Sequence, residues 1–434
     1  MGDIREIVRL ALPLTIGQLG QMGMILIDMV MVGKLGPAAI AGVGLGSSFY
    51  YVPALFAAGI LFGLDYFVSH ASGREDKEAC RHWLWQGLYL SMLISAPVVL
   101  AIEVLGPLAM RAWFSPDLAA QASAFLVTSS FGMPGFLVFT TVRQYLQASG
   151  SPRAGTVVTL LGVGCIVGLN WLFIFGPPQM GVAGAGLATS VTRTLMALAL
   201  LGFMAWRDGL VIPAPWAGQD VVKLVRLGTP IGVQLALEVG VFSLVSFLIG
   251  RFGAVAAAAH TVVANVAGFT YTLPMALSGA TAILVGRALG SGDRDRARTV
   301  GWKAIGLGTS LMAVMGLGLA AGGSHVAALF TTDAQVIALA SQLIVMVALF
   351  QVADGIQSVG GGALRGLGDT RASMLANLLG YWAVGVPVGY YFCFQLKWGA
   401  LGFWVGLTAG LYAVAVIVLR QWIVLARFRE DERT

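Results

Sequence analysis

The sequence contains few charged residues. Only 11% of its 434 residues are Asp, Glu, Lys or Arg, whereas 58% are apolar by type, and the mean hydropathy is +0.84. A soluble protein carries about 25% charged residues, which help to cover its surface. The shortage therefore argues against soluble enzymes, nucleic-acid-binding proteins and disordered chains. It indicates a chain whose surroundings are largely lipid.

Cysteine and histidine are also scarce. The three Cys and four His residues show neither the spacing of a disulfide framework nor that of a metal site, so we expect no cofactor. The net charge of +6 comes from basic residues that stand singly between apolar runs. We therefore expect no nucleic-acid partner and take the lipid bilayer as the main partner.

Long apolar runs bounded by charges, Gly or Pro predict transmembrane helices, because a bilayer core needs about 20 apolar residues in helical form. The first run is long enough to span, so we interpret it as a retained helix and not as a signal peptide. Twelve spans are expected, near residues 8–32, 40–70, 84–107, 121–147, 154–176, 182–206, 224–249, 256–289, 300–322, 334–364, 372–395 and 400–425.

The basic residues divide unequally between the two sides of these spans. Twenty-one lie on the side of the amino terminus, and four lie on the other side: Lys34, Arg111, Arg251 and Lys397. Cytoplasmic loops carry the excess of Lys and Arg, so both termini are predicted to be cytoplasmic in a bacterial inner membrane. The remaining basic residue, Arg193, falls inside the sixth span, and we expect it near the cytoplasmic end of that span.

The two halves of the chain resemble each other. Pro13 aligns with Pro230, and Arg153 aligns with Arg371, at a nearly constant offset along the chain. Chance similarity between Gly-rich apolar segments is the alternative, but matched Pro and charged positions argue against it. We predict an all-α polytopic protein of two pseudo-symmetric six-helix bundles. The amino-terminal lobe is 1–206, a cytoplasmic linker is 207–222, and the carboxy-terminal lobe is 223–434.

Five carboxylates lie inside predicted spans, where a charged group is costly and therefore indicates a functional site. Two of them, Asp65 and Glu103, lie toward the ends of their spans. A structural role, in which each fixes the packing of neighbouring helices, explains these two best. The other three, Asp28, Glu238 and Asp354, are the functional candidates.

Depth in the membrane selects these three. Glu238 lies near the middle of its span, and Asp354 lies eleven residues from Arg365, also well inside. Asp28 lies inside but closer to the outer leaflet. With no basic residue at the depth of Glu238 and Asp354, these two can exchange a proton or accept a cation.

Several motifs resemble those of the multidrug and toxic compound extrusion (MATE) transporters, particularly the bacterial NorM-type branch. The most specific lies in the eighth span, with Ala259-His260, Asn265, Tyr271-Thr272-Leu273-Pro274 and Gly292-Asp293. Others are Met31-Val32-Gly33, Met180-Gly181-Val182-Ala183-Gly184 and Leu364-Arg365-Gly366. The resemblance covers essentially the whole chain and implies the twelve-helix MATE fold.

The resemblance also implies roles for individual residues. The coupling and substrate-binding acids of NorM-type members match Asp28, Glu238 and Asp354, and the last two are candidates for binding Na⁺. Some relatives have a second Asp on helix five, where this chain has Asn170. The candidate polar ligands are Gln18, Asn170, Gln234, His260, Asn265 and Tyr271.

The implied function is secondary efflux of amphipathic organic cations, such as drugs and dyes, in antiport with Na⁺ or H⁺. A monomer is expected. Two alternative functions fit the sequence less well. A lipid-linked precursor flippase of the same superfamily would need a cationic cavity, whereas the deep charges here are acidic. An intramembrane prenyl transferase would need paired Asp-rich motifs, which Asp293-Arg294-Asp295 does not form.

Overall fold

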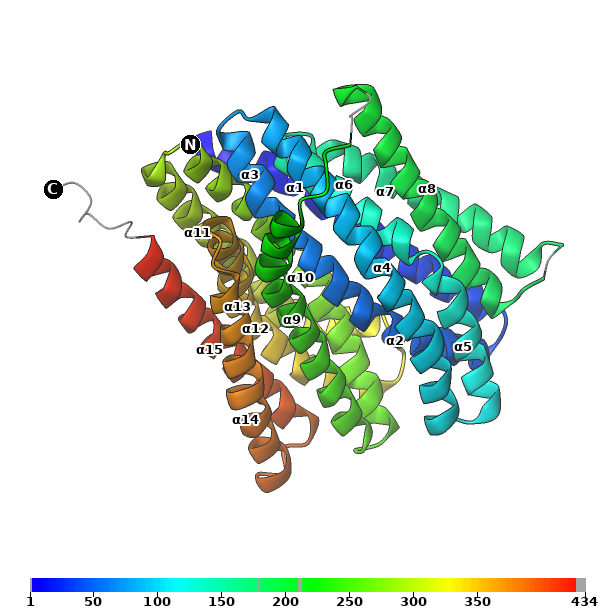
Figure 1. Cartoon of the computed structure of the whole chain (residues 1–434). Helices are drawn as coiled ribbons and strands as arrows, with labels where there is room; N and C mark the ends of the chain where they lie inside the picture. The colour runs from blue at the N-terminus through cyan, green and yellow to red at the C-terminus, as the bar shows by residue number, and fades with distance from the viewer. Residues whose placement is uncertain (1, 178, 210–212, 427–434) are drawn as a thin grey trace. The chain divides into compact units, whose positions relative to one another are not determined.

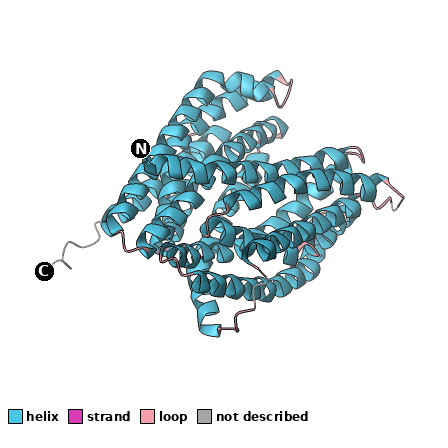
Figure 2. Cartoon of the chain, turned by 90° about the horizontal axis from the view of Figure 1, so that it is seen from above, coloured by secondary structure: helices cyan, strands magenta, loops and turns pink. Residues whose placement is uncertain are grey.

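The computed structural model describes residues 2–177, 179–209 and 213–426, and these residues form helices and short connections with no strand (Figure 2). The first half of the chain contains α1 (Gly2–Gly33), α2 (Pro37–Phe62), α3 (Leu64–Gly73), α4 (Lys77–Trp113), α5 (Pro116–Ser130), α6 (Met133–Ala148), α7 (Pro152–Asn170), the π-helix η1 (Trp171–Phe175) and α8 (Val182–Asp208). The second half contains α9 (Gly218–Gly250), α10 (Ala254–Gly290), α11 (Arg294–Ala328), α12 (Ala334–Leu367), α13 (Thr370–Asn377), η2 (Leu378–Gly385), α14 (Val386–Tyr390), η3 (Tyr391–Gln395) and α15 (Ala400–Leu425) (Figure 1).

These helices confirm the predicted spans. Eleven are long and apolar enough to cross a membrane, and the pair α5 and α6 makes a twelfth. The pair is bent by 48°, so the span predicted over 121–147 is broken near its middle. The break lies at Phe131 and Gly132, just before Pro134 in the first turn of α6, where proline has no N–H group to continue the helical hydrogen bonds of α5.

Apolar side chains in the middle of the helices point away from the protein. Leu93 and Leu100 of α4 are 60% and 63% exposed, and Val314 and Leu317 of α11 are 68% and 72% exposed. In water such a surface would be unfavourable, whereas hydrocarbon accommodates it without cost. The exposure pattern therefore fits a multi-pass membrane protein.

The conformations of turn glycines support the duplication. Gly36 has φ 111°, and Gly253, its counterpart in the second half, has φ 100°. Gly181 has φ 57° and ψ −128°, and its counterpart Gly399 has φ 56° and ψ −134°. Only glycine adopts these backbone angles without strain. The same unusual turn thus recurs in both halves, which chance similarity of Gly-rich segments does not explain.

The chain packs into two compact units. Unit 1 contains the chain up to Thr15 together with the chain from Val233 onward, and unit 2 is Ile16–Gly232. Each boundary falls inside a helix, two residues after Pro13 of α1 and two residues after Pro230 of α9. The predicted lobes 1–206 and 223–434 were defined by the sequence repeat, and the division into packing units does not test them. They stay a prediction.

In unit 1, α12 packs against α10, α11 and α15. The first turn of α1 is held on α11 by two ion pairs, with Asp3 to Lys303 at 2.6 Å and Glu6 to Arg296 at 2.8 Å. Because these ion pairs are partly exposed, each contributes little to the stability of the fold. We assign them the role of positioning the start of α1 on α11.

In unit 2, α8 packs against α5, α6 and α7, and α2 packs against α5. The first half of α9 approaches α2 closely, because Gly228 lies directly against the Ile60 carbonyl and leaves no room for a Cβ atom. The start of α9 is also joined to α4, where His82 Nε2 lies 2.9 Å from Asp220 Oδ2.

The predicted linker 207–222 includes the end of α8 and the start of α9, and its residues 210–212 lie outside the described residues. Its segment 213–217 is fastened to α4. The buried amide of Gln86 donates to Pro215 O at 2.9 Å and accepts from Ala217 N at 3.0 Å. Tyr89 donates to Ala214 O at 2.8 Å. These bonds satisfy backbone groups that no helix pairs.

Candidate functional site

Glu238, in α9 of unit 1, lies within a cluster of hydrogen-bond donors. Its Oε1 accepts from Gln357 Nε2 at 2.9 Å and from Gln234 Nε2 at 3.1 Å, and its Oε2 accepts from Tyr271 OH at 3.4 Å. Gln234 is one helical turn before Glu238, so both side chains share a face of α9. The other two donors come from α12 and α10, so three helices meet at this carboxylate.

Asp354, in α12, joins the same cluster. Its side chain is 3% exposed, and its Oδ1 lies 3.3 Å from Ser358 Oγ, which also donates to Gln357 Oε1 at 2.9 Å. Residues 354, 357 and 358 are spaced i, i+3 and i+4 and therefore lie on one face of α12. A continuous chain of hydrogen bonds thus connects the two acids.

Neither acid has a basic partner. In the part of the chain that the structure describes, no ion pair involves Glu238 or Asp354. A carboxylate that is charged in an apolar interior, with no basic partner, costs free energy. Two such carboxylates close together cost more, because like charges repel. Binding of a proton or of a cation removes this cost.

The fit to Na⁺ depends on neutral oxygens. No group of three or more His, Cys, Asp or Glu residues suited to a metal ion occurs in the described ranges. Na⁺ at Glu238 and Asp354 would therefore also need the Gln357 and Ser358 side-chain oxygens or the Tyr271 hydroxyl. Hard cations prefer such oxygen ligands.

The remaining predicted ligands of unit 1 lie apart from this cluster of hydrogen bonds. His260 is 3% exposed, its Nε2 lies 2.7 Å from Ser246 Oγ, and its ring lies 5.8 Å from that of Trp404. Asn265 is exposed and has no hydrogen bond to either acid among the described residues. Their roles as ligands stay predictions.

Asp28 lies in unit 2 and is 7% exposed. Asn170 Nδ2 donates to its Oδ1 at 2.6 Å, and Thr189 Oγ1 donates to its Oδ2 at 3.0 Å. The structure thus brings together Asp28 and Asn170, which the sequence singled out separately. Gln18 is half-buried in α1 and makes no hydrogen bond to Asp28 in the described part of the chain.

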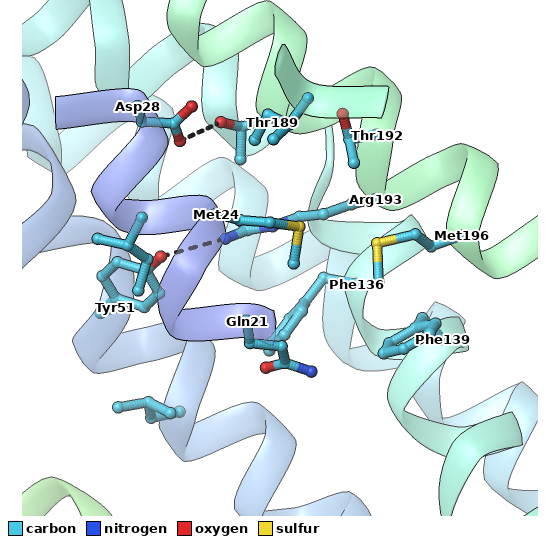
Figure 3. Close-up of a pocket in the computed structure, with 13 residues that line it drawn as sticks. Gln21, Met24, Asp28, Tyr51, Phe136, Phe139, Thr189, Thr192, Arg193 and Met196 are labelled. Carbon is cyan, nitrogen blue, oxygen red and sulfur yellow. Dashed lines mark hydrogen bonds between the residues drawn. The ribbon is translucent and has the colours of Figure 1, made fainter. Parts of the chain in front are cut away.

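Asp28 lines a cavity of about 100 Å³ (Figure 3). α1 contributes Gln21, Met24, Ile25 and Asp28, and α8 contributes Thr189, Thr192, Arg193 and Met196. Both sets have the spacing i, i+3, i+4 and i+7, which places each on one helix face. Further lining residues are Tyr51, Leu55, Phe136, Phe139 and Ile166.

Arg193 corrects one expectation. It lies eleven residues after the start of α8 and fifteen before its end, near the middle of the helix instead of at its cytoplasmic end. Its guanidinium donates to the hydroxyls of Tyr50 and Tyr51, and these contacts hold it inside unit 2. The expectation assumed that a single basic side chain in an apolar run extends to the membrane surface, and it was wrong because Arg193 has polar partners inside the unit.

The two carboxylates assigned to helix packing have polar partners. Asp65 Oδ2 accepts from Gln144 Nε2 at 3.0 Å, and Asp65 is 2% exposed. Glu103 Oε1 accepts from Ser130 Oγ at 3.0 Å. Both bonds join different helices, as expected of residues that fix packing.

The repeat places the two sites at corresponding positions with different chemistry. At the offset that relates the two halves, Glu238 corresponds to Gln21, and Asp354 corresponds to Phe136. Both of the earlier residues line the cavity of unit 2. The second half of the chain therefore has two acids at these positions, whereas the first half has a neutral amide and an aromatic ring.

Sequence reasoning missed Gln357, Ser358 and Arg193 as site residues. The positions three and four residues after Asp354 could have identified the first two, because they share its helix face. Arg193 was visible as the one basic residue inside a span, and its depth would have marked it as functional.

The fold and the two buried sites define a polytopic transporter with an internal repeat. The MatE family model matches residues 13–172 and again residues 230–391, so the chain belongs to the MatE family. The two matches begin at Pro13 and Pro230, the same pair of prolines that the repeat aligns.

Individual relatives agree with this assignment. The chain is 35% identical over 425 residues to the "Multidrug resistance protein NorM" of Burkholderia vietnamiensis, covering 95% of this chain and 92% of that protein. It is 34% identical over 439 residues to the "Probable multidrug resistance protein NorM" of Mesorhizobium japonicum, covering 97% and 94%. The resemblance to the NorM-type branch is thereby confirmed.

A solved structure supports the fold alone. The crystal structure of a eukaryotic MATE transporter superposes with a TM-score of 0.90 at 20% sequence identity, covering 99% of this chain and 98% of that one. The predicted all-α, twelve-span MATE fold is confirmed by this match together with the described helices.

Proposed function

We propose that this protein is a secondary multidrug efflux transporter that exports amphipathic organic cations, such as drugs and dyes, in exchange for Na⁺ or H⁺. Both NorM relatives are named for multidrug resistance, which supports drugs as the exported molecules. The observation that carries the proposal is the linked pair Glu238 and Asp354, which has hydrogen-bond donors and no basic partner among the described residues. Neither relative is named as a flippase, and nothing favours that alternative.

The acidic pair explains exchange in a simple way. A site that must be neutralised accepts either the coupling cation or a cationic substrate, and the two compete for it. A membrane potential adds about 2.3 kcal/mol per charge per 100 mV and drives inward movement of the coupling cation. Alternating access to the two sides of the membrane then converts this movement into export.

The location and assembly are part of the proposal. The division of basic residues, 21 against four, supports a bacterial inner membrane protein with both termini cytoplasmic. A monomer is sufficient, because both copies of the repeat are present in one chain. No cofactor is needed for transport driven by an ion gradient.

The decisive experiment uses purified protein in proteoliposomes loaded with a fluorescent organic cation such as ethidium. Na⁺ and pH gradients are imposed separately, with protein-free liposomes as the control. Export driven by one gradient supports the proposal and identifies the coupling ion. No gradient-dependent movement, together with unchanged ethidium accumulation in cells that express the protein, would contradict it.

A further inference from the structure

A second cavity of unit 2 lies beside the turn that joins α4 to α5 (Figure 1). The end of α4, one face of α5 and the start of α8 form this cavity, which we call the α4–α5 groove. Its volume of about 650 Å³ falls within the range of about 300–1,000 Å³ that is typical of ligand sites. It shares no lining residue with the cavity that Asp28 lines.

The α4–α5 groove is apolar except at one end. From α5 it is lined by Ala120, Ala124 and Val127, whose spacing i, i+4 and i+7 places them on one helix face. From α4 it is lined by Pro107 and Arg111, which are one helical turn apart and share a face. Among its described lining residues, Arg111 is the one charged residue and none is acidic.

The Arg111 guanidinium is exposed, and no described residue forms an ion pair with it. The nearest acidic residue in the sequence, Asp117, does not line the groove. At the offset of the repeat, the second half has Ala328 or Leu329 at this position. The charge therefore belongs to the first half alone, and its N–H groups are available to an anionic ligand.

The side chains around Arg111 indicate its level in the membrane. Leu105 and Leu108, which precede it on α4, are exposed large apolar residues, as expected of a helix that faces hydrocarbon. Trp113, two residues after it, is also exposed, and Trp is enriched at the level of the lipid headgroups. The groove thus extends from hydrocarbon to the headgroup level. In the proposed orientation this is the outer leaflet.

We propose that the α4–α5 groove binds one anionic phospholipid. Its phosphate lies on the Arg111 guanidinium, whose planar fork matches two phosphate oxygens in parallel hydrogen bonds. An acyl chain lies along α5, against Ala120, Ala124 and Val127. A zwitterionic phospholipid binds less tightly, because its ammonium group finds no acidic partner in the lining. This inference does not depend on the proposed efflux function.

The charge of the groove favours a lipid over a second copy of this chain. A symmetric contact between two copies through the same surface would bring two Arg111 side chains together, and like charges repel. A phospholipid instead supplies one negative group and one apolar chain. The groove offers one positive group and one apolar face, so the two are complementary.

The first experiment titrates the purified full-length protein in detergent with phosphatidylglycerol and with phosphatidylcholine of the same acyl chains. Native mass spectrometry counts the lipids bound. The unmodified protein should bind one phosphatidylglycerol more tightly than phosphatidylcholine. In R111Q the Kd for phosphatidylglycerol should rise about tenfold or more, because charge-assisted hydrogen bonds are lost, and R111K should restore part of the affinity. The control R251Q changes an exposed Arg that contacts Phe247 and should leave the affinity unchanged.

The second experiment locates the acyl chain. Phosphatidylglycerol with a photoreactive group on one acyl chain is crosslinked to the protein, and the labelled peptides are identified. We expect labelling within α5. A124F places a ring in the groove and should reduce this labelling, while the exposed position of Arg111 allows R111Q to be tested without disturbing the core.

The outcomes separate the groove from general binding of lipid. Equal affinities of R111Q and the unmodified protein, an equal loss in R251Q, or no preference between the two lipids would overturn the inference. Labelling confined to helices other than α4, α5 and α8 would do the same. If the protein at these lipid concentrations has the mass of a dimer without lipid, the occupant is a second copy and the inference is wrong. If A124F is poorly folded, the affinity of R111Q decides.

Discussion

Gln357 and Glu238 are joined by a hydrogen bond of 2.9 Å that connects α12 to α9. A carboxylate only accepts, so the amide nitrogen of Gln357 faces Glu238, and its Oε1 accepts from Ser358. Ser358 in turn lies beside Asp354. Two neutral side chains, Gln357 and Ser358, thus stand between the two acids.

Replacement of Gln357 by Leu should impair export without removing either acid. Glu238 would lose a buried donor, at a cost of about 1–3 kcal/mol. We expect efflux at a fixed ion gradient to fall about tenfold, measured as initial rates in proteoliposomes. Gln335→Leu, at an exposed position of the same helix, is the matched control. Equal rates in both variants would show that the link is dispensable.

Glu238→Gln and Asp354→Asn should each abolish ion-coupled efflux while the protein still inserts in the membrane. The amides keep the size of the acids but cannot bind a proton or attract a cation. Ethidium accumulation in cells should equal that of cells without the protein, and membrane fractions should contain normal amounts of each variant. Undiminished drug resistance in either variant is incompatible with the scheme.

Asp28→Asn should reduce export of cationic substrates. The change removes a buried carboxylate and, among the described residues that line the cavity around Asp28, leaves Arg193 as the only charged one. Initial rates of ethidium export in proteoliposomes, compared with those of the unmodified protein, check this expectation. An unchanged rate would show that the Asp28 charge is not needed for export.

Gly181→Ala and Gly399→Ala should destabilise the protein. Both positions have positive φ and strongly negative ψ, a combination that costs a non-glycine residue about 1–3 kcal/mol. The thermal unfolding midpoint in detergent should fall for each variant. Gly168→Ala, in a helical position with open space around it, should leave the midpoint unchanged or raise it. Similar midpoints for all three variants would contradict the argument.

Several features of this protein are readable from the sequence because they depend on local composition. Continuous apolar runs identify helices that cross a bilayer, since no other backbone conformation is satisfied there. The repeat was visible in matched Pro and Arg positions, and turn glycines such as Gly181 and Gly399 confirm it. Asp28, Glu238 and Asp354 were identifiable because a carboxylate inside an apolar run is costly whatever its neighbours are.

Tertiary structure alone decided which groups surround these acids. Thr189 and Asp28 are far apart in the chain, as are Gln357 and Glu238, yet each of the two donors reaches its acid with a hydrogen bond. Such contacts depend on how each helix is rotated and where it crosses its neighbours, which hydropathy does not encode. The same reason applies to Arg193, whose place beside Tyr50, Tyr51 and Phe136 follows from the packing of α8 on α2 and α6.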